Sequence, residues 1–197
     1  MFEFNEETAM EESIGSAGKK VLDSGVYDIT ILTASKTTAS TGTTGIDWSI
    51  KVDGAQYPNI IYGMWTHRAD GTTIFNANIV NALMGIVGAK KLTEIQKEIE
   101  VKDGKKTVTA YKELEGVKCK VAIQKVLDVY NGEVTEKNEI KAFFNENGQT
   151  FAEAKRSSKP KQMLYYQDKM KDKETTEYKK FQAEASDEIE DDIRSLL

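Results

Sequence analysis

The sequence predicts a mainly β protein: a β-barrel with one helix, followed by a disordered or weakly helical C-terminal tail. Apolar residues alternate with polar ones in several segments between Gly25 and Phe144, which is the period of a β-strand. One segment near the middle of the chain instead repeats its apolar residues every three or four positions, as an amphipathic helix does. Beyond Phe151 the residues are mostly charged or polar, so we expect no separate hydrophobic core there.

The first three strands are predicted in the first third of the chain. In the first two, the apolar residues that share a face are Tyr27, Ile29, Ile31, Ile46, Trp48, Ile50 and Val52. Asp53-Gly54 marks a tight turn, and the third strand extends over residues 57–65, with Pro58 indicating an edge or a bulge at its start. Residues 36–45 contain no strongly apolar residue and no acid, and they predict a long flexible loop between the first two strands.

A helix is predicted after the third strand, because Phe75, Ile79 and Leu83 recur every four positions before Gly88 indicates the end. A polar connector follows, with a turn predicted at Asp103-Gly104. The strands predicted after the helix lie around residues 107–111, 116–126 and 139–144. A hairpin turn at Tyr130-Asn131-Gly132-Glu133 is predicted to join the last two.

Three strands, one helix and two or more further strands occur in the order of a five-stranded OB-type barrel, where the helix closes one end. Other small α+β domains share this order. We therefore predict three parts: an acidic N-terminal arm over residues 1–20, an OB-like domain over 21–151, and a basic linker with an acidic tail over 152–197.

Charge is distributed unevenly along a chain whose net charge is −5. Residues 1–12 hold five acids and no base, and residues 183–197 hold six acids and one arginine. Residues 13–182 keep 26 basic and 21 acidic side chains, so the body is mildly basic between two acidic ends. A basic body attracts polyanions.

The composition favours a soluble cytoplasmic protein without a membrane partner. No apolar run approaches the roughly 20 residues that span a bilayer, and the acidic N-terminus does not resemble a signal peptide. The single cysteine, Cys119, excludes an internal disulfide framework.

The residues that enzymes use are scarce. With one histidine, His67, and one cysteine, the chain has no His/Cys metal cluster, and it contains no nucleophile elbow or phosphate-binding glycine motif. We therefore expect no catalytic residue, cofactor or metal. Carboxylates in or beside the strands leave a metal-dependent nuclease open as an alternative; they are Asp28, Asp47, Asp53 and Asp70.

Aromatic and basic residues occur together on the predicted strands, and a sequence-tolerant single-strand binder needs both. The candidate DNA-binding residues are Lys36, Trp48, Lys51, Tyr57, Tyr62, Trp65, Arg68, Lys118 and Lys120. Trp48 is in phase with core residues, so the core is the favoured place for it, whereas Trp65 ends its strand and is the better stacking candidate. For Lys118 and Lys120 a solvated strand face is an equal alternative. The predicted loop over residues 36–45 would donate hydrogen bonds to phosphates, or it would have no role.

The chain resembles the single-stranded-DNA-binding proteins of bacteria and especially of their phages. The resemblance rests on "GVYDITI", "IDWSIKVDG" and "IIYGMW" in a barrel, followed by a tail that combines acids with hydrophobic residues. It implies that the tail binds replication and recombination proteins and competes with DNA. The implied tail residues are Asp187, Glu188, Glu190, Asp191, Asp192, Leu196 and Leu197. The bacterial type ends in phenylalanine, whereas this chain ends in "DDIRSLL".

The sequence thus favours a non-enzymatic protein that coats and protects single-stranded DNA during phage DNA replication or recombination, in the host cytoplasm. Its rivals are a structural or protein-interaction component of a virion or scaffold, and the metal-dependent nuclease. A homodimer formed through a strand edge or through Tyr165-Tyr166 is left open.

Overall fold

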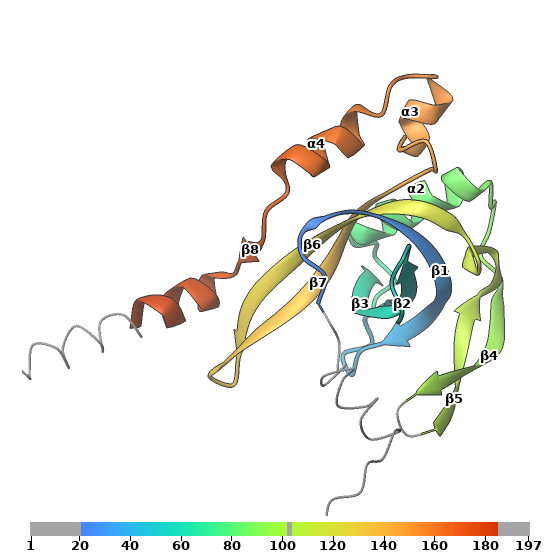
Figure 1. Ribbon diagram of the computed structural model, residues 1–197. Helices are drawn as coiled ribbons and strands as arrows, with labels where there is room; N and C mark the ends of the chain where they lie inside the picture. The colour runs from blue at the N-terminus through green and yellow to red at the C-terminus, as the bar shows by residue number, and fades with distance from the viewer. Residues whose placement is uncertain (1–20, 102–103, 185–197) are drawn as a thin grey trace, which may run out of the picture.

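The computed structural model describes residues 21–101 and 104–184, which fold around one large curled β-sheet (Figure 1). The elements in chain order are β1 (Gly25–Thr38), β2 (Thr44–Val52), β3 (Asn59–His67), α2 (Asn76–Val87), β4 (Glu94–Val101), β5 (Gly104–Tyr111), the 3-10 turn η1 (Lys112–Leu114), β6 (Lys118–Tyr130), β7 (Glu133–Phe144), α3 (Phe151–Lys155), α4 (Lys161–Lys169) and β8 (Lys173–Glu174). The prediction of a mainly β protein is confirmed.

The long strand β1 organises the sheet. Along one edge β1 pairs with β2, which in turn pairs with β3. Along its other edge β1 pairs first with β6 and then, at Ser35, with β5. All these pairs are antiparallel, as are β4–β5 and β6–β7.

The predicted closed barrel of five strands is not what forms. The described residues contain eight strands, and no hydrogen-bonded ladder among them joins β3 to β7, although these two strands approach each other. Residues 94–101, expected within a polar connector, are the strand β4. There Ile95 and Ile99 alternate with Glu94 and Glu98, which is the two-residue period of a strand. The many charged residues of this segment made that period hard to recognise.

The hydrophobic core lies between the curled sheet and α2. Helix α2 turns Ile79, Val80 and Leu83 inward and ends at Gly88, whose φ of 73° is left-handed, as predicted. Trp48 is fully buried at the centre of the core: its ring centroid lies 5.2 Å from that of Phe143.

The predicted long loop over residues 36–45 is wrong. Strand β1 continues to Thr38 and β2 begins at Thr44, opposite it in register. The chain reverses in a short turn, where the Ala39 amide donates to the Thr43 carbonyl at 2.8 Å. Threonine favours strands, so the threonines of this segment extend the hairpin. A flexible phosphate-wrapping loop is therefore absent from this part of the described chain.

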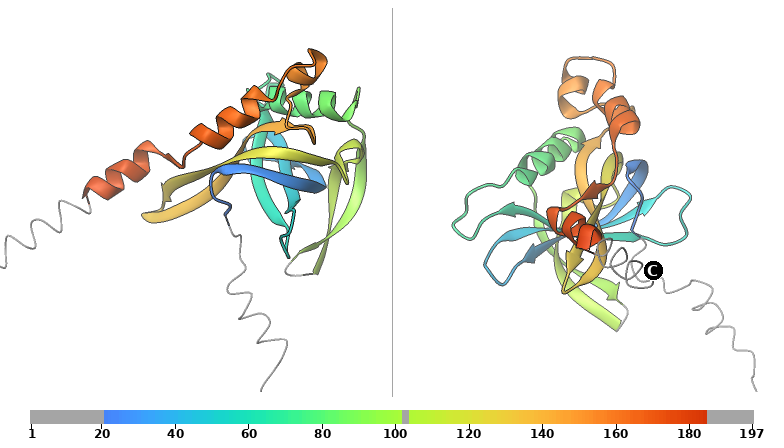
Figure 2. Two further views of the ribbon diagram at one scale, coloured as in Figure 1. Left: turned by 45° about the horizontal axis from the view of Figure 1, so that its top comes forward. Right: turned by 90° about the vertical axis from the view of Figure 1, so that its left-hand side faces the viewer.

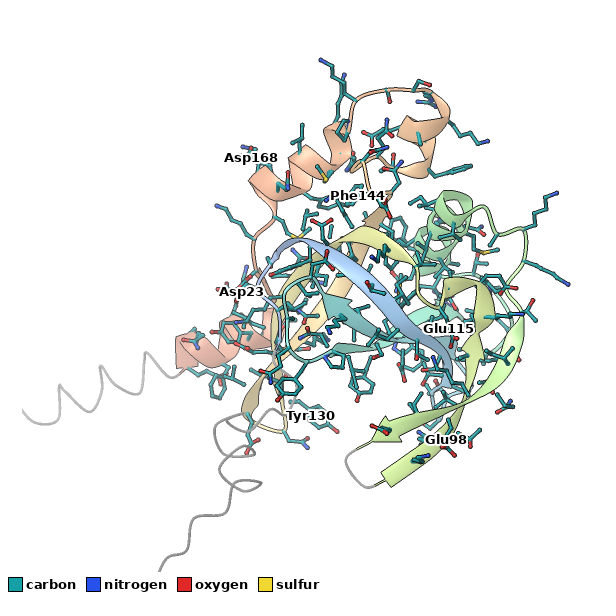
Figure 3. The ribbon with its side chains drawn as sticks, turned by 45° about the vertical axis from the view of Figure 1, so that its right-hand side comes forward. Asp23, Glu98, Glu115, Tyr130, Phe144 and Asp168 are labelled. Atoms are coloured by element: carbon teal, nitrogen blue, oxygen red, sulfur yellow. The ribbon has the colours of Figure 1, made fainter. Side chains whose placement is uncertain are left out.

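The C-terminal segment over residues 151–184 is folded rather than linker-like, and it runs along the outer side of β6 and β7 (Figures 1 and 2). Strand β8 pairs with β6 in parallel, and residues 176–184 are helical. Phe144 of β7, labelled in Figure 3, packs its ring against Tyr166 of α4 with centroids 6.1 Å apart.

Helix α3 rests on α2 through one glycine. The ring of Phe151 lies so close to Gly85 that a Cβ added there would sit 2.7 Å from a ring carbon. The Phe151 ring of α3 therefore packs directly against the backbone of α2 at Gly85.

Candidate nucleic-acid interface

A β-bulge interrupts the pairing of β2 with β3. Trp48 pairs with Ile61 and Ile46 pairs with Met64, so the single residue between them on β2, Asp47, stands opposite two residues of β3. All four paired residues are buried in the core. The sequence placed a bulge or edge at Pro58; the bulge lies further along the strand, and β3 is an edge strand as predicted.

The bulge brings Tyr62 and Trp65 to the same face of the sheet. Side chains alternate along a strand, so residues three apart normally point to opposite faces. The extra residue at Tyr62–Gly63 shifts this alternation by one, and both rings leave the core side. Tyr62 is 53% exposed and Trp65 is half-buried.

Asp47 and Gly63 hold the bulge in place. The Gly63 amide donates to Asp47 Oδ1 at 2.7 Å, and Gly63 has a φ of 65°, which favours glycine. The Trp65 indole lies over this glycine, because a Cβ added there would sit 3.2 Å from an indole carbon. Trp65 is thus held against the backbone rather than free to swing.

Two further apolar side chains are exposed nearby, one on β3 and one in the turn before it. Ile60 is 48% exposed, and Tyr57, in the turn before the strand, is 45% exposed. The Tyr57 hydroxyl accepts a hydrogen bond from Gln56 Nε2 at 2.9 Å. We call Ile60, Tyr62 and Trp65 the aromatic row.

Lys51 and Lys118 face the same side as the aromatic row. In β2, Asp47 and Lys51 alternate with buried residues, so Lys51 points away from the core. Thr30 of β1 stands directly opposite Lys51 on one side and opposite Lys118 on the other. Both lysines are exposed, and neither forms an ion pair with a described residue. We call Lys51, Thr30 and Lys118 the basic row.

Three of the predicted DNA-binding residues lie in different surroundings from Lys51 and Lys118. Trp48 cannot stack on a base, because it is fully buried and its indole N–H points at Met64 Sδ, 3.2 Å away. Lys36 is in register with buried Ile46, away from the basic row, and its Nζ lies 2.8 Å from Glu94 Oε1. The hydrogen bond to Glu94 raises the pKa of Lys36. Lys120 shares the face of Lys118 but is ion-paired with Asp28.

Arg68 begins the turn that follows β3, close in sequence to Trp65. Its amide donates to the Thr72 carbonyl at 2.8 Å, which closes the turn. Asp70 accepts hydrogen bonds from the Thr72 hydroxyl and amide, and these lower the pKa of its carboxyl. Arg68 is therefore exposed on an ordered turn beyond the aromatic row.

A hollow beside Lys118 is lined by carboxylates that are far apart in the sequence. Its lining includes Asp28, Asp53 and Glu146, with Cys119 beneath. Burial raises the pKa of the Cys119 thiol to about 12, with the nearby Asp28 adding to the shift, so this thiol stays protonated.

No group of three histidine, cysteine or carboxylate side chains that could hold a metal ion occurs among the described residues. Of the four aspartates named for the nuclease alternative, three have partners of their own: Asp28 pairs with Lys120, Asp47 with the Gly63 amide, and Asp70 with Thr72.

Some sequence predictions lie outside the described residues. These are the N-terminal arm over 1–20, the turn residue Asp103, and the tail residues Asp187, Glu188, Glu190, Asp191, Asp192, Leu196 and Leu197. Within the described part, no helix has the length and apolar character needed to cross a membrane.

A scan against models of known protein families finds no match to this chain, and a search of curated proteins finds none either.

Proposed function

We propose that this protein binds single-stranded DNA and coats it during DNA replication or recombination, without catalysing a reaction. One observation carries the proposal: the bulge at Tyr62–Gly63 puts two rings on the face that also presents Lys51 and Lys118. Rings for the bases and cations for the phosphates are the two requirements of sequence-tolerant binding.

In this mechanism the aromatic row receives the bases. A base that stacks on a side-chain ring gains about 1–3 kcal/mol. Because Trp65 is held over Gly63, little side-chain freedom is lost when a base stacks on it. The basic row then contacts phosphates across β2, β1 and β6, and Arg68 extends the positive charge beyond β3.

The order of the strands supports this proposal. Without the β4–β5 hairpin and β8, the order is β3-β2-β1-β6-β7, with α2 following β3. That is the strand order of an OB barrel opened between its third and fifth strands, and such barrels bind oligonucleotides over their second and third strands.

The resemblance to phage-encoded single-stranded-DNA-binding proteins supports a role for the acidic tail over residues 186–197. In this proposal the tail recruits replication and recombination proteins and competes with DNA for the basic row.

A fluorescence titration with oligo-dT, with and without Mg²⁺, tests the function. Trp48 is buried, so quenching on binding reports a base stacked on Trp65. We expect quenching, an affinity that falls steeply with added salt, and no cleavage. Absence of binding would favour a structural protein, and degradation in Mg²⁺ would favour the nuclease.

Matched variants locate the binding face. Tyr62→Ala should weaken oligo-dT binding by roughly 5- to 100-fold, the equivalent of one lost stacking contact. Tyr130→Ala is the control, because Tyr130 is equally aromatic and 71% exposed but lies at the tip of the β6–β7 hairpin (Figure 3). Equal effects of the two substitutions would contradict a site on β3.

A further inference from the structure

The segment between α3 and α4 gathers four exposed cations, which the proposed site does not use. They are Lys155, Arg156, Lys159 and Lys161, and we call residues 155–161 the basic loop. None of the four forms an ion pair with a described residue. Lys155 lies over the Phe151 ring, with its Nζ 5.6 Å from the centroid.

One carboxylate, Glu153, joins the start of α3 to the start of α4, on either side of this loop. Its Oε2 accepts from the Thr150 amide at 2.9 Å, while the Thr150 hydroxyl accepts from the Glu153 amide, which is a capping box at the start of α3. Its Oε1 accepts from the Gln162 amide at 3.0 Å, at the start of α4. The Glu153 carboxylate is thus engaged with backbone N–H groups.

Hydrogen bonds fix the middle of the loop as well. The Ser158 amide donates to the Glu153 carbonyl at 2.9 Å, and the Ser158 carbonyl accepts from Gln149 Nε2 at 2.6 Å. The loop therefore presents its cations on an ordered backbone. Cations on an ordered backbone lose less conformational entropy when they bind an anion than cations on a flexible chain do.

The turn over residues 145–149 connects the basic loop to the basic row. Its residue Glu146 lines the hollow that Lys118 also lines. Its residue Gln149 holds Ser158 of the loop, and its Gly148 contacts Met163 of α4. A polyanion that crosses β2, β1 and β6 and leaves at Lys118 would meet the basic loop on the far side of this turn.

We propose that the basic loop is a second phosphate-binding surface, which holds single-stranded DNA beyond the sheet face. This inference rests on the proposed function, because it assigns the loop to the same strand. It predicts that the loop contributes to the binding of long oligonucleotides and not of short ones.

The test compares the variant K155Q/R156Q/K159Q/K161Q with the wild type on oligo-dT of about 8 and about 30 nucleotides, lengths chosen because one such domain covers about 4–16. We expect unchanged affinity for the short strand and at least tenfold weaker binding of the long one. The slope of log affinity against log salt should fall by about 2–3 on the long strand, because each lost phosphate contact removes about 0.7.

Two further variants distinguish the effects of the position of the cations and of the ordered loop backbone from the effect of the net charge of the protein. K106Q/K171Q/K179Q/K180Q removes the same charge from exposed lysines elsewhere and should bind the long strand more tightly than the loop variant does. Glu153→Ala keeps all four cations and makes the chain more positive, yet it should weaken long-strand binding because it releases the loop. Circular dichroism checks that each variant is folded.

The outcomes distinguish this inference from the proposed function. If the loop variant matches the charge control while Tyr62→Ala still weakens binding, the inference is overturned and the function stands. If the wild type binds neither oligonucleotide, both fall. Binding of a synthetic peptide of residues 183–197 to the loop, with DNA affinity unchanged by the loop variant, would also overturn it in favour of an acidic peptide partner.

Discussion

At the scale of single residues, the two tryptophans have opposite roles that their neighbours decide. Trp48 alternates with Ile46 and Ile50 on a regular strand, so the sequence was enough to favour the core for it, and this is confirmed. Trp65 owes its direction to the bulge, where Asp47 faces two residues. Strand periodicity does not contain that information, because the bulge depends on a side chain of the neighbouring strand.

Exchanging each tryptophan for phenylalanine should separate stability from binding. Trp48→Phe should lower the free energy of unfolding by roughly 2 kcal/mol, because it leaves space beside Phe143, and should change DNA affinity little. Trp65→Phe should leave stability nearly unchanged while abolishing the quenching of tryptophan emission by DNA. Urea unfolding and a fluorescence titration measure the two effects, and the reverse pattern would refute the assignment.

Asp47 should act through its acceptor oxygen. Asp47→Ala leaves the Gly63 amide without its partner, which should cost roughly 1–3 kcal/mol of stability and free the Trp65 ring. Asp47→Asn keeps an acceptor at the same place and should lose much less. Urea unfolding and the tryptophan emission maximum compare the two, and identical behaviour would show that the carboxylate does not organise the bulge.

At the scale of elements, the most predictable parts were those with strong local signals. The helix was predicted from apolar residues four positions apart and from the glycine that ends it. The hairpin turn at Asn131-Gly132 was predicted from two residues that accept a positive φ, and their φ angles are 52° and 79°. The misread parts, β4 and the end of β1, are rich in charged residues or threonine. Both are paired within hairpins, β4 with β5 and the end of β1 with β2, and their polar side chains leave a weaker apolar alternation than the central strands have.

The docking of the C-terminal segment on β6 should depend on Asp128. This carboxylate accepts from the Thr175 hydroxyl at 2.8 Å and pairs with Lys137, and these hydrogen bonds, Thr175's first, lower its pKa. Because the pKa of Asp128 is lower in the folded protein than in the unfolded chain, ionised Asp128 stabilises the fold. This stabilisation is complete at pH values above the ordinary aspartate pKa of about 3.9, and it is lost as the pH falls through the pKa of the folded protein.

Asp128→Asn should therefore reproduce at neutral pH what strong acid does to the wild type. The amide of Thr175, which donates to the Leu127 carbonyl, should then exchange its hydrogen faster. Hydrogen exchange read by NMR measures this, with the Gly63 amide as an internal control far from the change. Unaltered protection of Thr175 in the variant would mean that β8 docks without Asp128.

At the scale of the whole molecule, the net charge does not describe the surface formed by the basic row. The chain is acidic overall, yet residues 13–182 are mildly basic, and neither Lys51 nor Lys118 forms an ion pair with a described residue. Much of the candidate site could be named from the sequence, because lysine and aromatic types are visible there. Which of them share a face could not, since Lys36 and Lys51 are both exposed strand lysines and only pairing separates them.

Removing residues 183–197 should strengthen DNA binding at low salt. The truncation deletes six acids and one base, so a competing polyanion is lost. The difference from the full chain should shrink as salt rises, because screening weakens both interactions. Titrations at two ionic strengths measure it, and equal or weaker binding by the truncated chain at low salt would contradict the tail's competing role.

The contact between Gly85 and Phe151 has a consequence for how this chain can change. An alanine at position 85 would suit an isolated helix better by about 1 kcal/mol, yet its methyl group would collide with the ring beneath α3. The helix propensity of residue 85 and the docking of α3 on α2 therefore favour different residues at this position. A substitution that favours α2 locally would therefore displace α3, and with it the adjoining basic loop, without changing any charged residue.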